Sequence, residues 1–168
     1  MLPSDRAIVF RTFRPGDEAA FHQLNAAWIE QLFVLEELDR IVLDDPYTHV
    51  LARGGQICMA ELPARDGALP IGCCALVRIG PGEYELAKMA VSEAVRGHGI
   101  GRRLLRFAID IARQMGAHRL CLESNTKNEA AIHLYEELGF RHLPAPPHPS
   151  KYARANVFME LLLAQPEA

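Results

Sequence analysis

The strongest constraint on the fold is a change of hydrophobic period around a short glycine-rich segment. Residues 84–91 have the pattern of a β-strand, and from residue 100 to residue 115 apolar side chains recur at helical spacing. Gly116 then stands where a helix commonly ends. Between strand and helix lies the segment Arg96, Gly97, His98, Gly99, Ile100 and Gly101. This order predicts an α/β protein whose backbone turns sharply at the glycines.

The rest of the chain alternates between strand and helix patterns. Strands are predicted at 7–13, 71–79, 84–91, 118–123, 140–143 and 156–163, with two more inside 48–62 joined by a hairpin turn at Gly54 and Gly55. Helices are predicted from about residue 17, at about 30–43, at 100–115, and from a capping box that Thr126 and Glu129 would form. Loops are predicted at 63–70 and at the proline-rich residues 144–149.

Length and charge narrow the class of protein. A chain of 168 residues predicts one domain over residues 1–168. The formal net charge of −3 argues against nucleic acid as the main partner. No apolar run approaches the ~18 residues that a membrane helix needs, and residues 1–6 have no signal-peptide pattern, so we expect a soluble, cytoplasmic protein with no membrane partner. The four cysteines lie in or beside apolar runs and are expected to be buried thiols.

The glycine segment is suited to binding a phosphate group. Glycine lets the backbone approach a ligand closely, and the first N–H groups of the following helix have no partners within the helix. Together with the helix dipole they favour an anion such as pyrophosphate, and Arg96, Arg102 and Arg103 add positive charge. A plain strand-to-helix turn is the alternative. The spacing does not match a P-loop or a dinucleotide fingerprint. A nucleoside-dependent methyltransferase is disfavoured because five residues intervene after Val91.

Two motifs together resemble the GNAT superfamily of N-acetyltransferases. The first, [RQ]-x-x-G-x-[GA], is matched by Arg96, Gly99 and Gly101. The second, N-x-x-A-x-x-L-Y-x-x-x-G-F, is matched about 30 residues downstream by Asn128, Ala131, Leu134, Tyr135, Gly139 and Phe140. The resemblance is firm over residues 84–140 and loose elsewhere. It implies a mostly antiparallel central sheet, flanked by about four helices and splayed open between its fourth and fifth strands.

The resemblance also implies how acetyl-CoA would bind. The backbone at Met89, Ala90 and Val91 would pair with the pantetheine arm like an added strand. The backbone N–H groups from Arg96 to Arg102 would hold the pyrophosphate, and Asn128 would approach the arm from the other side. No two of the seven histidines have metal-ligand spacing on an obvious common face, so no metal is expected.

Transfer to an amine requires a proton acceptor and a proton donor. An alkyl amine has a pKa of about 10.4, so it must lose a proton at neutral pH. Glu85, six residues before Val91, stands where some members of the family carry a catalytic glutamate, and strict alternation would place it on one face with Ala87, Met89 and Val91. Tyr135, seven residues after Asn128, is the candidate that protonates the departing thiolate. A strand-end glutamate in water and a core tyrosine are the structural alternatives.

The resemblance therefore implies an acetyl-CoA-dependent N-acetyltransferase that acts by direct transfer. The alternative is a non-catalytic acyl-CoA-binding sensor with the same fold. The acceptor would be a small-molecule or peptide amine, and a homodimer is one assembly that the family allows. The acidic stretch containing Glu36 and Asp39 has two interpretations, a solvated helix face or a surface that attracts a cationic amine.

Overall fold

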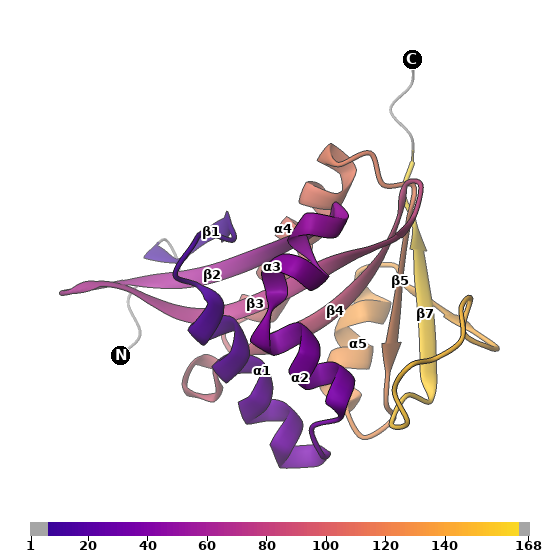
Figure 1. Ribbon diagram of the computed structural model, residues 1–168, viewed down its shortest axis with the longest axis horizontal. Coiled ribbons are helices and arrows are strands. Elements are labelled where there is room, and N and C mark those ends of the chain that lie inside the picture. The colour runs from indigo at the N-terminus through magenta and orange to yellow at the C-terminus, as the bar shows by residue number, and fades with distance from the viewer. Residues whose placement is uncertain (1–6, 165–168) are drawn as a thin grey trace.

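A mixed sheet of seven strands runs through the molecule in the order β1-β2-β3-β4-β5-β7-β6 (Figure 1). The computed structural model describes residues 7–164, so the expectation about residues 1–6 lies outside the described part. The parallel pair is β4 with β5, and the other neighbouring strands are antiparallel. The strands are β1 (Val9–Thr12), β2 (Gln56–Ala64), β3 (Gly67–Gly80), β4 (Glu83–Val91), β5 (Arg119–Ser124), β6 (Arg141–Leu143) and β7 (Val157–Leu162).

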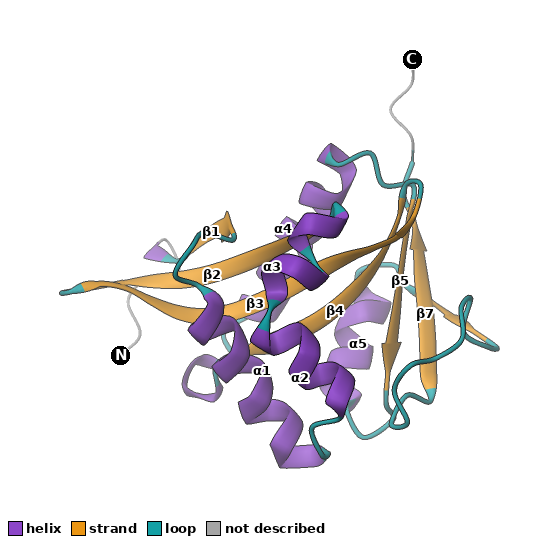
Figure 2. Ribbon diagram, in the orientation of Figure 1, coloured by secondary structure: helices purple, strands orange, loops and turns teal. Residues whose placement is uncertain are grey.

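Helices cover both faces of this sheet (Figure 2). One face carries α1 (Glu18–Leu32), α2 (Glu37–Asp44) and α3 (Pro46–His49), and the other carries α4 (Ile100–Gln114) and α5 (Glu129–Glu137). Each face has its own apolar core, and adjacent strand residues divide between them: Cys73 packs in the core that contains Phe21, and Cys74 in the core that contains Leu104. The predicted mixed α/β class is therefore confirmed.

The helix α4 forms where the sequence predicts it. Its buried residues recur along one stripe: Ile100, Leu104, Leu105, Ala108, Ile109 and Ala112. Burying each large side chain of this stripe contributes about 1.5–3 kcal/mol. The helix ends before Gly116, whose positive φ of 80° suits the turn that follows. The apolar stripe anchors α4 on β2, β3 and β4, and this fixes the position of its N-terminus.

The prediction for residues 48–53 was wrong. This region forms the short helix α3 and the 3₁₀ turn η2 (Leu51–Arg53), because Pro46 stands at the start of a helix whose N-cap side chain, Asp45, accepts a hydrogen bond from the backbone of Thr48 at 3.0 Å. The predicted loop at 63–70 is instead mostly strand. There β2 and β3 form a long hairpin, in which Ala64 pairs with Gly67.

Two helix boundaries also differ from the predictions. The first helix continues to Leu32, and the second begins only at Glu37 after a break. Glu36 and Asp39 form a capping box there, with the Asp39 carboxylate accepting from the Glu36 backbone at 2.9 Å. The capping box predicted at Thr126 is not formed, because α5 starts at Glu129 with Asn128 as its N-cap. Both α2 and α5 have an acidic side chain in the first turn, where the helix dipole favours a negative charge.

A β-bulge in β4 changes which side chains share a face. Ala75 of β3 pairs with Ala87, whereas Cys73 pairs with Ala90, so β4 contains one extra residue. Lys88 lies at the bulge with a φ of 53°, a left-handed conformation that costs a side-chain-bearing residue about 1–3 kcal/mol.

The bulge overturns the prediction that one face carries Glu85, Ala87, Met89 and Val91. Met89 and Val91 pack against the same core as Tyr84 and Leu86. Glu85 alternates with Tyr84 and Leu86 and therefore points to the opposite face. Alternation holds on each side of the bulge but not across it.

The sheet splays open between β4 and β5, as predicted. Pairing between these strands is confined to Glu83–Arg119, Tyr84–Leu120 and Glu85–Cys121, and the rest of β4 diverges from β5 (Figure 1). Strand β5 continues to pair with β7 along its whole length. Within residues 7–164, no helix is both long and apolar enough to cross a membrane.

Candidate active site

A cavity of about 560 Å³ lies in the splay between β4 and β5. Its walls come from β4, the glycine segment, the end of β5, the start of α5, the end of α1 and the segment before β7. The cavity therefore joins parts of the chain that are far apart in sequence. Twelve of the thirteen predicted site residues line it: Glu85, Met89, Ala90, Val91, Arg96, Gly97, Gly99, Ile100, Gly101, Arg102, Asn128 and Tyr135.

The glycine segment turns from β4 into α4 through two left-handed residues. Gly97 has a φ of 82° and Gly99 a φ of 72°, and Gly99 is the N-cap of α4. Both positions disfavour a side chain, although nothing lies within 4 Å of the place a Cβ would occupy. The unpaired N–H groups at the start of α4 therefore lie at the wall of the cavity, where the helix dipole favours an anion.

The arginine side chains that we expected to surround this turn make contacts with other parts of the protein. Arg102 lines the cavity but forms an ion pair with Glu137 of α5. The guanidinium of Arg103 lies 5.0 Å from the ring centroid of Phe10 on β1. Arg96 donates to the backbone carbonyl of Val91 at 3.3 Å, and His98 is exposed and does not line the cavity. Backbone groups thus dominate this wall, with Arg96 and Arg102 at its edge.

The end of β4 is the second wall of the cavity. Met89, Ala90 and Val91 line it. On one side these residues are held by β3, where Ala90 pairs with Cys73 and Val91 with Gly72. In the described part of the chain, no strand pairs with them on the β5 side. An extended ligand could therefore take the place of a strand here, as the resemblance implies.

Glu85 lies at the other end of the cavity, where β4 and β5 still touch. Burial, and to a lesser degree the nearby charge of Glu123 on β5, raise the pKa of its carboxyl group to about 7. Lys151 and Lys88 oppose this shift. A carboxyl group with such a pKa can accept a proton near neutral pH, which is the property that a general base needs. Its catalytic role stays a prediction.

Tyr135 and Asn128 approach the cavity from α5. The Tyr135 hydroxyl is 4.0 Å from Sδ of Met89, and its ring centroid is 5.8 Å from that of Phe140. Burial raises the pKa of this phenol, so it stays protonated at neutral pH and can act as a proton donor. Asn128 is the N-cap of α5 and also lines the cavity. Their roles toward a ligand stay predictions.

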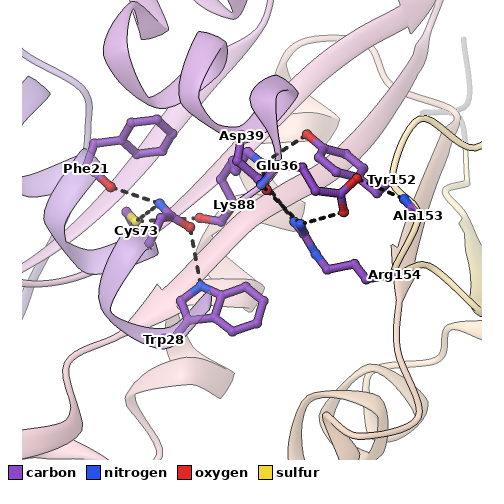
Figure 3. A network of polar contacts seen from close by, with 10 residues as sticks. Phe21, Trp28, Glu36, Asp39, Cys73, Lys88, Tyr152, Ala153 and Arg154 are labelled. Atoms are coloured by element: carbon purple, nitrogen blue, oxygen red, sulfur yellow. Dashed lines mark hydrogen bonds and ion pairs between the residues drawn. The ribbon is translucent and has the colours of Figure 1, made fainter. Parts of the chain in front are cut away.

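The sequence did not reveal a buried charge network around Asp39 (Figure 3). Lys88 donates to Asp39 at 2.5 Å and to the Tyr152 hydroxyl at 2.9 Å, and Arg154 donates to both oxygens of Asp39 at 2.7 and 2.8 Å. Burial alone would raise the pKa of Asp39, but the hydrogen bonds from Arg154 and Lys88 outweigh it and lower the pKa to about 2.

At Asp39 this network corrects both interpretations of the acidic stretch, of which the solvated one holds for the exposed residues Glu37, Asp44 and Asp45. Asp39 is fully buried, and its charge is compensated by Lys88 and Arg154. It is therefore neither a solvated residue nor a free charge that attracts an amine. The one available signal was Lys88 itself, a charged residue in an otherwise apolar strand end. Its partners are 49 and 64 residues away along the chain, too distant for spacing rules to connect.

Comparison with solved structures identifies the fold as one found among acetyltransferases. A GNAT-family acetyltransferase of Staphylococcus aureus superposes with a TM-score of 0.82 at 21% identity, covering 94% of this chain and all of that one. The yncA protein of Salmonella typhimurium, solved with its cofactor acetyl-CoA, superposes with a TM-score of 0.73 at 25% identity, covering 96% and 97%.

The sequence comparisons give the family. Residues 18–140 match the model of the acetyltransferase (GNAT) family, and the chain belongs to this family. The predicted resemblance is therefore confirmed. The N-alpha-acetyltransferase RimI of Mycobacterium tuberculosis is 41% identical over 83 residues, which cover 48% of this chain and 51% of that protein. The chain thus spans about half the length of this relative.

Proposed function

We propose that the protein is an acetyl-CoA-dependent N-acetyltransferase that moves an acetyl group directly to a primary amine. The observation that carries the proposal is the meeting of both family motifs in one cavity. The glycine turn and the Asn128–Tyr135 part of α5 lie far apart in sequence, yet they line the same splay as the unpaired side of β4. A cytoplasmic location and a homodimer remain expectations that accompany this proposal.

The residues present fit acetyl-CoA. Backbone N–H groups from Arg96 to Arg102 would hold the pyrophosphate, since the start of α4 offers unpaired donors and a favourable dipole. The backbone of Met89 and Val91 would hold the pantetheine arm, because these residues have a partner strand on one side only. Asn128 would hold the arm from α5. The thioester supplies the activated acetyl group.

The protein's own groups would move two protons. Glu85 takes a proton from the acceptor ammonium, directly or through a water, and leaves a neutral amine whose lone pair can attack the acetyl carbonyl carbon. As the new C–N bond forms and the C–S bond breaks, the electron pair leaves with sulfur. Tyr135 donates its hydroxyl proton to that thiolate, and the second proton that the nitrogen loses on becoming an amide restores the phenol. The buried position of Tyr135 supports this role, because its raised pKa keeps the proton available.

The acceptor is proposed only as a class. The name of the mycobacterial relative specifies an α-amine. Glu85 and Glu123 line the acceptor end of this cavity, and their charge suits a cationic amine. A peptide with a free N-terminus, or a small molecule with a primary amine, both fit this description. The non-catalytic sensor remains the second candidate, because the cavity alone does not require turnover.

A thiol-release assay tests the proposal. The wild-type protein is incubated with acetyl-CoA and a panel of free amino acids, an aliphatic diamine and hexapeptides with free N-termini, and acetylated products are identified by mass spectrometry. We expect release of coenzyme A that depends on one class of amine. Binding of acetyl-CoA without turnover on any amine would favour the sensor. No binding at all would contradict both candidates.

A further inference from the structure

Asp39 has a saturated carboxylate. Its Oδ1 accepts from Lys88 Nζ at 2.5 Å and from Arg154 at 2.8 Å, while its Oδ2 accepts from Arg154 at 2.7 Å and from the backbone N–H of Glu36 at 2.9 Å. The side chain has 0% exposure, and that of Lys88 has 5%. A buried ion pair is tolerated only when its remaining hydrogen-bonding groups are satisfied, which is the case here.

The network joins the start of α2 to two segments that line the cavity. Asp39 belongs to the start of α2, just after the break that contains Phe33, Lys88 belongs to the bulge of β4, and Arg154 belongs to the segment before β7. Glu36, just before α2, adds two bonds to the segment before β7. Its carboxylate accepts from the backbone N–H of Ala153 at 3.0 Å and from Arg154 at 3.1 Å. Figure 3 shows the side chains converging on Asp39 from these separate elements.

The bulge depends on Lys88 keeping an unfavourable backbone conformation. Lys88 is the one residue other than glycine, within residues 7–164, that has a positive φ. Such conformations persist where the surroundings over-determine them. Lys88 is held at its ammonium group by Asp39 and by the hydroxyl of Tyr152, whose ring centroid is 4.6 Å away. The next residues along the strand are those that line the cavity beside the glycine turn, Met89 to Val91.

We propose that Asp39 is a positioning residue, which holds the β4 bulge through Lys88 so that the backbone of residues 89–91 can pair with the pantetheine arm. This inference rests on the proposed function. Asp39 itself touches no reacting atom. Its charge keeps Lys88 in the left-handed conformation, and the bulge in turn directs Met89 and Val91 toward the α4 side of the sheet.

The chain offers a matched control in Asp17. Its carboxylate also accepts two hydrogen bonds from one arginine, Arg11, at 2.7 and 2.9 Å, and one from a backbone N–H, that of Arg14, at 2.7 Å. It too is buried, with a side-chain exposure of 10%. Asp17 stands at the start of α1 and does not line the cavity or contact β4 through any of these bonds. Asp17→Asn therefore reports the general cost of removing a buried charge.

The experiment compares two ligands by calorimetric titration. Acetyl-CoA contains the arm, and adenosine 3′-phosphate 5′-diphosphate contains the phosphates without the arm. Each is titrated into the wild-type protein and into Asp39→Asn, Lys88→Met and Asp17→Asn. We expect Asp39→Asn to weaken acetyl-CoA binding by about tenfold or more, since misplacing a binding group by an ångström has effects of this size or larger. Lys88→Met should weaken it in the same direction, and binding of the nucleotide should stay within about twofold of wild type, because its phosphates contact the start of α4.

Three results would overturn the inference. One is equal acetyl-CoA affinity in Asp39→Asn and wild type, another is equal weakening of both ligands, and the third is the same loss in Asp17→Asn. If Asp39→Asn does not fold, Lys88→Met decides, because it leaves the Asp39–Arg154 pair in place. Failure of the proposed function gives a different result, since the wild-type protein would then not bind acetyl-CoA.

Discussion

The two ends of the cavity differ in the kind of group that builds them. The end that we assign to acetyl-CoA, which we call the cofactor end, consists mainly of backbone: the glycine turn, the start of α4 and the unpaired side of residues 89–91. The end that we assign to the amine, the acceptor end, consists of charged and hydroxyl side chains, among them Glu85, Glu123 and Tyr152. Backbone N–H donors are present whatever the side chain, whereas a single substitution at the acceptor end removes a functional group.

The difference teaches where sensitivity to substitution should lie. At the cofactor end, changing a side chain should matter little unless it alters the path of the backbone or places a negative charge beside the phosphates. At the acceptor end, removing the Glu85 carboxylate should remove a step of the reaction. Substitutions that keep the shape of a side chain and change its chemistry can break or sharpen this contrast.

The largest effect on the reaction rate is expected for Glu85→Gln. Loss of a general base commonly costs about 10²–10⁴-fold in rate, and we expect kcat to fall by about 100-fold. In the wild-type protein kcat/KM should rise with pH through about 7, because burial and Glu123 raise the pKa of Glu85 to that value and only the deprotonated form accepts a proton. The pH profile of the thiol-release rate measures both, and the rise near pH 7 should disappear in the variant.

Stability provides the control for this variant. Folding raises the pKa of Glu85 from 4.5 to about 7, so the folded state favours the neutral carboxyl group. The stability that this preference contributes is present at low pH and is lost as the pH rises through about 7. A neutral glutamine should therefore increase the melting temperature at pH 8 relative to wild type and change it less at pH 5. A lower melting temperature at pH 8 would show that Glu85 is better accommodated as a charged group than its surroundings indicate.

A moderate effect is expected for Tyr135→Phe. A thiol has a parent pKa of about 8.5, so a thiolate is a tolerable leaving group, and we expect kcat to fall by about tenfold. Acetyl-CoA affinity should stay near that of wild type, because the hydroxyl makes only a 4.0 Å contact with Met89. Steady-state kinetics together with calorimetry separate the two quantities. An unchanged kcat would mean that water or another group supplies the proton.

The smallest effect is expected for Arg102→Gln at the cofactor end. Arg102 already forms an ion pair with Glu137, and its side chain is 47% exposed. Exposed pairs contribute little, so the dissociation constant for acetyl-CoA should change by only about two- to threefold. Calorimetry at low and moderate salt measures it. A loss of tenfold or more would mean that side-chain charge, and not backbone, dominates the cofactor end.

The same contrast explains what could be predicted from the sequence. The cofactor end was predictable because it depends on local rules: glycines at positions of positive φ, a helix start, and an apolar stripe that anchors α4. The splay and the mixed sheet followed from the family resemblance. The helical conformation of residues 46–53 was missed because the Asp45–Pro46 stop signal also starts the next helix.

The acceptor end was harder because it depends on tertiary contacts. The bulge at Lys88 reverses the alternation of side chains between the two faces of β4, and no local pattern in residues 84–91 indicates it. In the sequence Asp39 is one acid among several, and its partner Arg154 lies 115 residues away along the chain. Charge networks that combine residues more than 100 positions apart become visible only when the chain is folded.

Acetyl-CoA binding tests the central claim most directly, measured by calorimetry on wild type, Gly99→Glu and Gly116→Glu. Both glycines belong to the two ends of α4, both have a positive φ, and neither has an atom within 4 Å of an added Cβ. The strain of substitution is therefore matched, but only Gly99 lines the cavity. We predict tight binding to wild type and Gly116→Glu, and a loss of about 100-fold or more in Gly99→Glu, where the added carboxylate would repel the pyrophosphate. Equal affinity in the two variants would contradict the assignment of the glycine turn to acetyl-CoA.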